Sequence, residues 1–254
     1  MVLSESTRAL VRLRLGQAVE CVGDSNQVIG DHHSDVAAFF GAAVCFFGLV
    51  GAWAAPHCRK RNKSAEYVAR ISSLVHAVGA SILTGACLLD RYLKMEPWGA
   101  PTTCQEGMAL SFSVAYFMID MVGILTGDFF DWVFVLHHIA CIAGILWTFV
   151  TGDAGHFVTL VVCCLEVTNP FMHMHWLNVF DQRVQGPWYD LNRFGFIVSF
   201  TFVRGLIGPW LIYVCYTIGL PWYLSALGGG FFVFSMRALV AILQKEIKGE
   251  MWTS

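Results

Sequence analysis

Seven long apolar runs constrain this chain more than any other feature of its sequence. Each is close to the ~20 mostly apolar residues that an α-helix needs to cross a hydrocarbon core ~30 Å thick. Lipid cannot hydrogen-bond a bare backbone, and the runs lack the alternating polarity of β-barrel strands, so we expect α-helices. The expected spans are Val36–Ala55, Ile71–Leu89, Met108–Thr126, Trp132–Val150, Gly155–Met172, Phe194–Tyr216 and Trp222–Leu243.

Composition agrees with a chain that faces lipid. Of the 254 residues, 56% are hydrophobic and only 13% are charged, whereas soluble domains carry about 25% charged residues. A formal net charge of −2 argues against nucleic acid as a partner. The predicted fold class is therefore all-α, a polytopic membrane helix bundle of about seven transmembrane helices with no soluble domain.

Basic residues next to the first run predict the orientation. The densest cluster contains Arg59, Lys60, Arg61 and Lys63, and such loops stay in the cytosol. Alternation then places the N-terminus outside the cytosol and the C-terminus inside it. Basic residues in the C-terminal tail agree with this orientation, while three arginines among the first fourteen residues oppose it.

Cysteine usage indicates no metal centre. Most of the nine cysteines fall inside apolar runs, where a thiol behaves as a small hydrophobe. No C-x-x-C motif occurs, so a zinc or redox site has little support, and we expect neither a metal nor a bound cofactor. A disulfide between Cys21 and Cys104 stays open, because both residues could face the same compartment.

Ionisable side chains inside the apolar runs predict a site, because burial in lipid is costly and such groups usually face the bundle interior. The six candidates are His76, Asp120, His137, His138, Glu166 and Arg204. A rise of ~1.5 Å per residue puts the first five ~9–10 Å from the expected cytosolic ends of their helices, and Arg204 ~15 Å from its own. Ionisable side chains from five helices thus lie at similar depths, in one layer in the cytosolic half of the membrane. Taken singly, each residue could instead hold the bundle together through an interhelical pair.

The adjacent His137 and His138 favour a chemical function more than the other candidates do. Neighbouring helix positions point about 100° apart, so the two imidazoles cannot serve the same packing purpose. One can react while the other, or a carboxylate such as Asp120 or Glu166, orients it. Imidazole titrates near neutral pH and can act as general base or nucleophile in the cell.

These residues, in this order, resemble the TLC-domain family, which includes ceramide synthases and translocating-chain-associated proteins. The resemblance covers about residues 70–245 and rests on stretches of five successive helices: Ser73–Ala77, Ala115–Asp120, Val135–His138, Leu165–Phe171 and Phe202–Arg204 followed by Pro209-Trp210. After His138 the chain reads Ile139–Ile145 and lacks the acidic continuation of the synthases. It therefore resembles the short TLC-domain proteins more than true ceramide synthases. The implied organisation is a polar segment 1–35, a first helix 36–56, a six-helix domain 70–245 and a cytosolic tail 246–254.

The resemblance implies a role in lipid metabolism in the endoplasmic reticulum, with membrane lipid as partner. For an enzyme we expect acyl transfer from acyl-CoA to a sphingoid base. The resemblance then implies catalytic roles for His137, His138, Asp120 and Glu166. The expected substrate-binding residues are His76, Arg204, Arg59, Lys60 and Arg61.

Two other functions stay open. We expect the ionisable residues to converge on one interior cavity, and a non-enzymatic lipid-binding protein could use that cavity to regulate membrane composition without turnover. A trafficking or translocation factor would depend on loops and tails, which are short here. A receptor or ion pathway is disfavoured, because the polar residues do not line a complete path across the membrane.

Overall fold

The structure, a computed structural model, describes residues 33–60, 64–127 and 130–248. These ranges contain helices and no strand, and seven of the helical spans are long and apolar enough to cross a membrane. The predicted all-α membrane bundle is confirmed. The elements in chain order are α2 (His33–Lys60), α3 (Ala65–Leu93), α4 (Cys104–Thr126), α5 (Trp132–Thr151), α6 (Gly155–Glu166), α7 (Asn169–Phe180), α8 (Pro187–Phe202), the π-helix η2 (Val203–Ile207), α9 (Gly208–Thr217) and α10 (Trp222–Lys248).

Local sequence explains where several helices begin. The side chains of Ser64 and Asp131 accept hydrogen bonds from the first-turn amides of α3 and α5. Thr103 and Glu106 form a reciprocal capping box at the start of α4. Such caps satisfy amides that have no partner within the helix.

Two of the membrane spans are not simple α-helices. The fifth breaks between α6 and α7, where Pro170 lacks an amide proton and its ring excludes a regular turn. The sixth contains η2 between α8 and α9, and the amide of Gly208 donates to the carbonyl of Val203, five residues earlier. Pro209 follows directly. Both irregular segments lie inside a span, where their backbone groups need partners from neighbouring helices.

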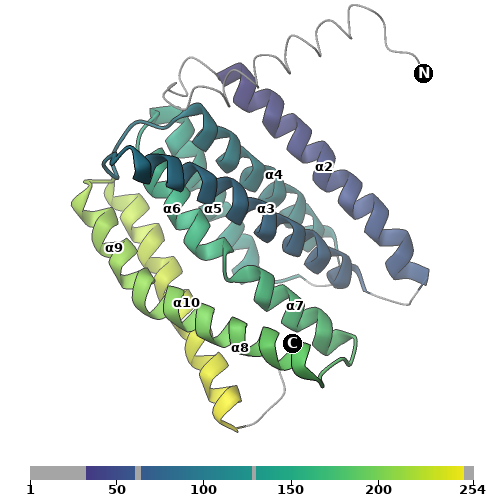
Figure 1. Ribbon diagram of the computed structural model, residues 1–254. Coiled ribbons are helices and arrows are strands. Elements are labelled where there is room, and N and C mark those ends of the chain that lie inside the picture. The colour runs from purple at the N-terminus through teal and green to yellow at the C-terminus, as the bar shows by residue number, and fades with distance from the viewer. Residues whose placement is uncertain (1–32, 61–63, 128–129, 249–254) are drawn as a thin grey trace, which may run out of the picture.

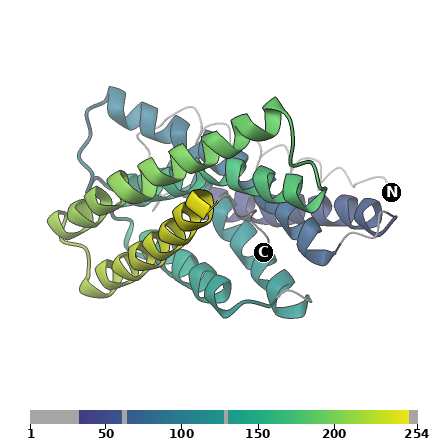
Figure 2. The same ribbon diagram turned by 90° about the horizontal axis from the view of Figure 1, so that it is seen from below.

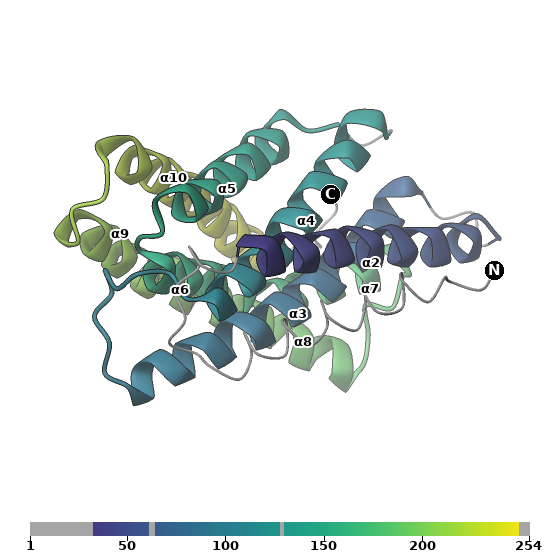
Figure 3. The same ribbon diagram turned by 90° about the horizontal axis from the view of Figure 1, so that it is seen from above.

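The central helices are α3, α4 and α6 (Figure 1). Helix α2 packs on α4 and α3 at one edge, and Figure 3 shows it on the side away from α9 and α10. In Figure 2, α8, η2 and α9 follow one another as a continuous rod beside α10. The main hydrophobic cluster joins α2, α4, α5 and α6 around Phe47, Leu110, Tyr116 and Ile145. Helix α5 makes only sparse contact with α6 and α10.

The outer surface suits a lipid environment. Large apolar side chains such as Leu49, Ile82 and Leu206 are exposed along the spans. Aromatic residues stand exposed near helix ends, where amphipathic rings favour the membrane interface: Trp132 at the start of α5, Trp188 at the start of α8, Trp222 at the start of α10, Tyr92 near the end of α3 and Tyr216 near the end of α9.

Each predicted span lies within an observed helical segment, and the observed segments extend further, most of all at the end of the fifth. We expected the fifth span to end at Met172, but α7 continues to Phe180. The added segment contains His173 and His175, which lower its hydropathy although both side chains are buried by protein. Most of the predicted polar segment 1–35 lies outside the described residues.

A buried ion pair that we did not predict fixes the connection between α3 and α4. Arg91 donates to both carboxylate oxygens of Glu106, over 2.9 and 2.7 Å, and both residues are almost fully buried. Arg91 also contacts Glu96 and the carbonyl of Pro101. The Glu106 carboxylate also accepts a hydrogen bond from the amide of Thr103 at the start of α4. The same carboxylate therefore neutralises Arg91 and caps the helix.

Candidate functional site

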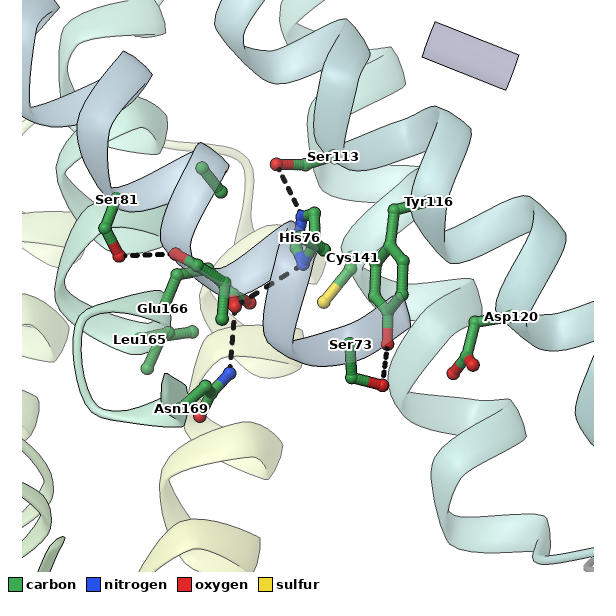
Figure 4. Close-up of polar contacts among 12 residues, drawn as sticks. Ser73, His76, Ser81, Ser113, Tyr116, Asp120, Cys141, Leu165, Glu166 and Asn169 are labelled. Carbon is green, nitrogen blue, oxygen red and sulfur yellow. Dashed lines mark hydrogen bonds and ion pairs between the residues drawn. The ribbon is translucent and has the colours of Figure 1, made fainter. Parts of the chain in front are cut away.

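His76 lies at the centre of the bundle, with both ring nitrogens engaged. Its Nε2 is 3.2 Å from the hydroxyl of Ser113, and its Nδ1 is 3.5 Å from the carboxylate of Glu166. Figure 4 shows the ring between these two groups. Glu166 also accepts a hydrogen bond from the side-chain amide of Asn169, over 2.9 Å. The end of α6 is thereby tied to α3.

Tyr116 covers one face of His76. The two rings are stacked 3.9 Å apart with an interplanar angle of 9°. The phenol of Tyr116 donates to the hydroxyl of Ser73, over 2.7 Å, and Ser73 donates to the carbonyl of Ala69. The polar atoms around His76 are therefore held by an ordered network rather than by solvent.

His138 and Asp120 form a second pair next to the first. The Nε2 atom of His138 is 2.9 Å from the Asp120 carboxylate, and its Nδ1 is 2.7 Å from the carbonyl of Phe134. A carbonyl oxygen only accepts, so Nδ1 carries a proton and Nε2 shares one with the carboxylate. The ring lies edge-on to Phe117 and 6.2 Å from Tyr116, so Tyr116 and Phe117 connect the two pairs.

His137 differs from its neighbour because it has no strong partner. Its Nδ1 is buried without a hydrogen bond, and its Nε2 is 3.8 Å from the sulfur of Cys141. The ring packs edge-on against Phe231 of α10. Of the two adjacent histidines, only His137 thus has a ring nitrogen that is buried without a hydrogen-bond partner.

An apolar cavity of about 170 Å³ opens between α5, α6, η2–α9 and α10. Its lining is hydrocarbon along most of its length, including Val161, Leu211 and Leu227, and its other side chains are the thiols of Cys141 and Cys215, the guanidinium of Arg204 and the hydroxyl of Ser235. Cys141 and Phe231 belong to this lining and also contact His137. The cavity therefore adjoins the polar cluster.

The structure gathers the predicted residues of the spans around this region, with partners more specific than expected. We expected Asp120 or Glu166 to orient the histidine pair. Asp120 does contact His138, whereas Glu166 contacts His76. Arg204 lies at the wall of the cavity.

Arg59, the one basic residue of the first loop whose side chain the structure describes, is not part of the cluster. Arg59 is exposed at the end of α2, which is an edge helix. The side chain of Lys60 and the whole of Arg61 lie outside the described residues. A role for them in binding acyl-CoA stays a prediction.

Hydropathy could not single out several members of the site. Tyr116, Ser113, Ser73 and Asn169 are uncharged, and such residues occur on any helix face. A helical spacing of three or four residues was the available signal, because Ser73 and His76 share one face of α3 and Ser113 and Tyr116 share one face of α4. Which face is internal depends on packing.

Comparison with known proteins decides the family, since the TLC domain matches residues 66–245. The chain belongs to the TLC-domain family. This TLC domain is similar to TLC domain-containing protein 4 A of Dictyostelium discoideum, with 25% identity over 150 residues, 57% of each chain. The match thus spans a little over half of that relative. No solved structure matches the chain.

These findings confirm the expected resemblance, including the likeness to a short TLC-domain protein. The cluster and the cavity are both built by helices of the TLC domain, α3 to α10, with α2 packed outside it.

Proposed function

We propose that this TLC-domain protein binds a fatty acyl chain within the membrane and transfers the acyl group from acyl-CoA to an acceptor lipid at His137 and His138. The observation that carries the proposal is the shared boundary between cavity and cluster. Cys141 and Phe231 line the cavity and contact His137. A chain in the cavity would therefore end beside a histidine with an unpartnered nitrogen.

The chemistry follows from the positions of the two imidazoles. His137 removes a proton from the amine or hydroxyl of the acceptor, whose nitrogen or oxygen then attacks the thioester carbonyl. The new bond to the acyl carbon forms as the carbon–sulfur bond breaks, and the coenzyme A thiolate leaves and takes up a proton. The hydrogen bonds of His138 to Asp120 and Phe134 hold that ring, and with it the first turns of α5, in place.

Lipid metabolism, the endoplasmic reticulum and a sphingoid base as acceptor enter this proposal from the family resemblance. The resemblance supports the sphingoid base least of the three, because the ceramide synthases, which use this acceptor, differ from this chain after His138. Acyl-CoA supplies the acyl group from the cytosolic side, and the membrane supplies the acceptor.

Acyl transfer is tested in membranes from cells that express the protein, with labelled acyl-CoA and a long-chain amine. We expect product with the wild type and a loss of about 10²- to 10⁴-fold with His137→Ala, the usual effect of removing a general base. The matched control is His57→Ala, because His57 is an exposed histidine at the end of α2. Full product from both His137→Ala and His138→Ala would exclude catalysis by the pair.

A lipid-binding protein without turnover is the second candidate. The observation that favours it is the internal satisfaction of His76, His138 and Glu166, whose polar atoms already contact protein groups. Residues whose polar atoms are all hydrogen-bonded within the protein can stabilise the bundle around a bound lipid without taking part in a reaction. If the wild type binds labelled acyl lipid but forms no product with any acceptor, this second function replaces the first.

A further inference from the structure

Arg204 lies on the π-helical turn of the sixth span, at the wall of the cavity. A π-turn inserts one extra residue into a helix and often occurs at functional sites. Gly208 closes the turn, and a Cβ atom there would lie 3.2 Å from the ring of Phe232 on α10. The irregular turn is thus packed tightly against α10 and holds the arginine beside the cavity.

The guanidinium of Arg204 is poorly compensated for a cation inside a membrane span. It donates to the hydroxyl of Ser235 over 3.3 Å and to the carbonyl of Leu165 over 3.4 Å, both long distances. Its Nε is buried without a hydrogen-bond partner, and it lies 5.1 Å from the ring of Phe200. Among the described residues, no carboxylate forms an ion pair with it.

Glu166 attracts the guanidinium electrostatically, but it forms no direct ion pair with Arg204, and its carboxylate contacts His76 and Asn169 instead. A charged arginine at the centre of a membrane costs several kcal/mol unless it is paired or hydrated. The cavity beside it offers hydrocarbon rather than water. An anionic group on a ligand would supply the missing partner.

The shape of the cavity indicates the kind of ligand. From Arg204 the lining continues along α9 to Cys215, a length of ~16 Å at the helical rise. That length matches one leaflet of a hydrocarbon core ~30 Å thick. A cavity with a cation at one end and apolar walls beyond it fits a single chain that carries one terminal acid.

We propose that Arg204 binds the carboxylate of a free fatty acid, whose chain occupies the cavity. This inference rests on the proposed function, because it names a ligand for the same cavity. A fatty acid bound there takes the place of the acyl chain that is to be transferred and therefore competes with acyl-CoA. Fatty-acid level would then regulate the site.

The test compares two competitors of equal chain length, one with an anionic and one with a neutral head group. The purified full-length protein in detergent is labelled with a photoreactive fatty acid, without acyl-CoA, and the label is displaced by palmitic acid or by hexadecanol. We expect palmitic acid to displace the probe from the wild type at about 10- to 100-fold lower concentration, the usual contribution of hydrogen bonds to a charged group. The ratio of the two concentrations is internal to each sample and does not depend on the folded fraction.

The variants assign this preference to one side chain. Arg204→Met should bring the ratio close to one, and Arg204→Lys should retain part of it, because lysine keeps the charge but not the planar fork. The control is Arg193→Met, since Arg193 pairs with Glu246 and is not part of the cavity lining. A wild type that does not distinguish acid from alcohol, or an Arg204→Met variant that still does, would overturn the inference.

The binding ratio tests the fatty-acid site and the transfer assay tests acyl transfer, so either proposal can be rejected without the other. Loss of the preference in Arg204→Met beside a wild type that forms no product would support the fatty-acid site and reject the transferase.

Discussion

The two adjacent histidines of α5 use their ring nitrogens in opposite ways. His138 has partners on both nitrogens, while His137 keeps a buried nitrogen without a hydrogen bond. An unsatisfied buried polar atom is costly and invites a functional explanation. At the scale of single residues, therefore, His137 is the better candidate for contact with a ligand, and His138 for a positioning role.

The buried ion pair between Arg91 and Glu106 stabilises two charges inside the protein without a ligand. Glu106→Ala would leave Arg91 buried beside an empty position, and we expect a loss of about 3–5 kcal/mol of stability. Thermal denaturation of the detergent-solubilised protein measures the change. Asp90→Ala is the control, because the Asp90–Lys94 pair is partly exposed and worth about 0–1 kcal/mol.

The double variant Arg91→Met/Glu106→Leu separates the pair from its surroundings. It removes both charges, so much of the lost stability should return. A double variant as unstable as Glu106→Ala would instead assign the loss to the capping box of α4, where Glu106 accepts from the amide of Thr103.

At the scale of elements, two interrupted spans face each other beside the cavity. At the break between α6 and α7, the carbonyl of Leu165 accepts from the hydroxyl of Thr168 and from Arg204 of η2. Broken helices inside a membrane expose backbone groups, which is why they occur where a cavity or a neighbouring helix supplies partners. The loose packing of α5 against α6 and α10 leaves the space that these irregular segments border.

Gly144 tests whether the cavity holds the lipid chain. It lines the cavity on α5, and a Cβ atom there would meet nothing within 4 Å. Gly144→Leu should therefore fill part of the cavity and weaken labelling by the photoreactive fatty acid, with little loss of stability. Gly123→Leu is the control, since Gly123 also has open space but lies outside the lining. Equal labelling of both variants would place the chain elsewhere.

Gly155 tests the contact between two connecting segments. A Cβ atom at Gly155, the first residue of α6, would lie 2.5–2.7 Å from the side chain of Thr102. Thr102 is fully buried and its amide donates to the carbonyl of Gly152, so it has little room to move. We expect Gly155→Ala to cost about 1–3 kcal/mol through overpacking, measured by thermal denaturation. An unchanged melting temperature would show that the connection adapts.

At the scale of the whole molecule, the side of the membrane that each connection faces determines from which compartment a ligand can reach the cavity. Cys104, the first residue of α4, is disulfide-bonded, and disulfides persist in oxidising compartments. Cys21, whose pairing with Cys104 the sequence leaves open, lies outside the described residues. The orientation itself stays a prediction, with the α3–α4 connection outside the cytosol and residues 61–63 inside it.

We therefore expect epitope tags after Lys60 and at the C-terminus to be labelled from the cytosol after selective permeabilisation of the plasma membrane. A tag within 94–99 should require permeabilisation of all membranes. Labelling of the first two tags on opposite sides would contradict an even number of spans between them, and reversed labelling of all three would invert the orientation.

The sequence by itself determined the membrane class, the helical spans, the family and the ionisable residues of the site. All of these depend on local composition or on ordered motifs, since one apolar run of sufficient length defines a span without reference to its neighbours. His76, Asp120, His138 and Glu166 stood out because charge within such a run is costly wherever the helix packs.

Only the tertiary structure decided which of these residues contact one another and where the cavity lies. The pairs His76–Glu166 and His138–Asp120 join residues that are 90 and 18 positions apart, and helix rotation rather than depth selects between them. Tyr116, Ser113 and Arg91 escaped prediction because their importance comes from the face they share with a neighbouring helix. An interior cavity was predicted but its walls were not, since a void arises from how α5, α6, α9 and α10 fail to close against each other, which no single segment encodes.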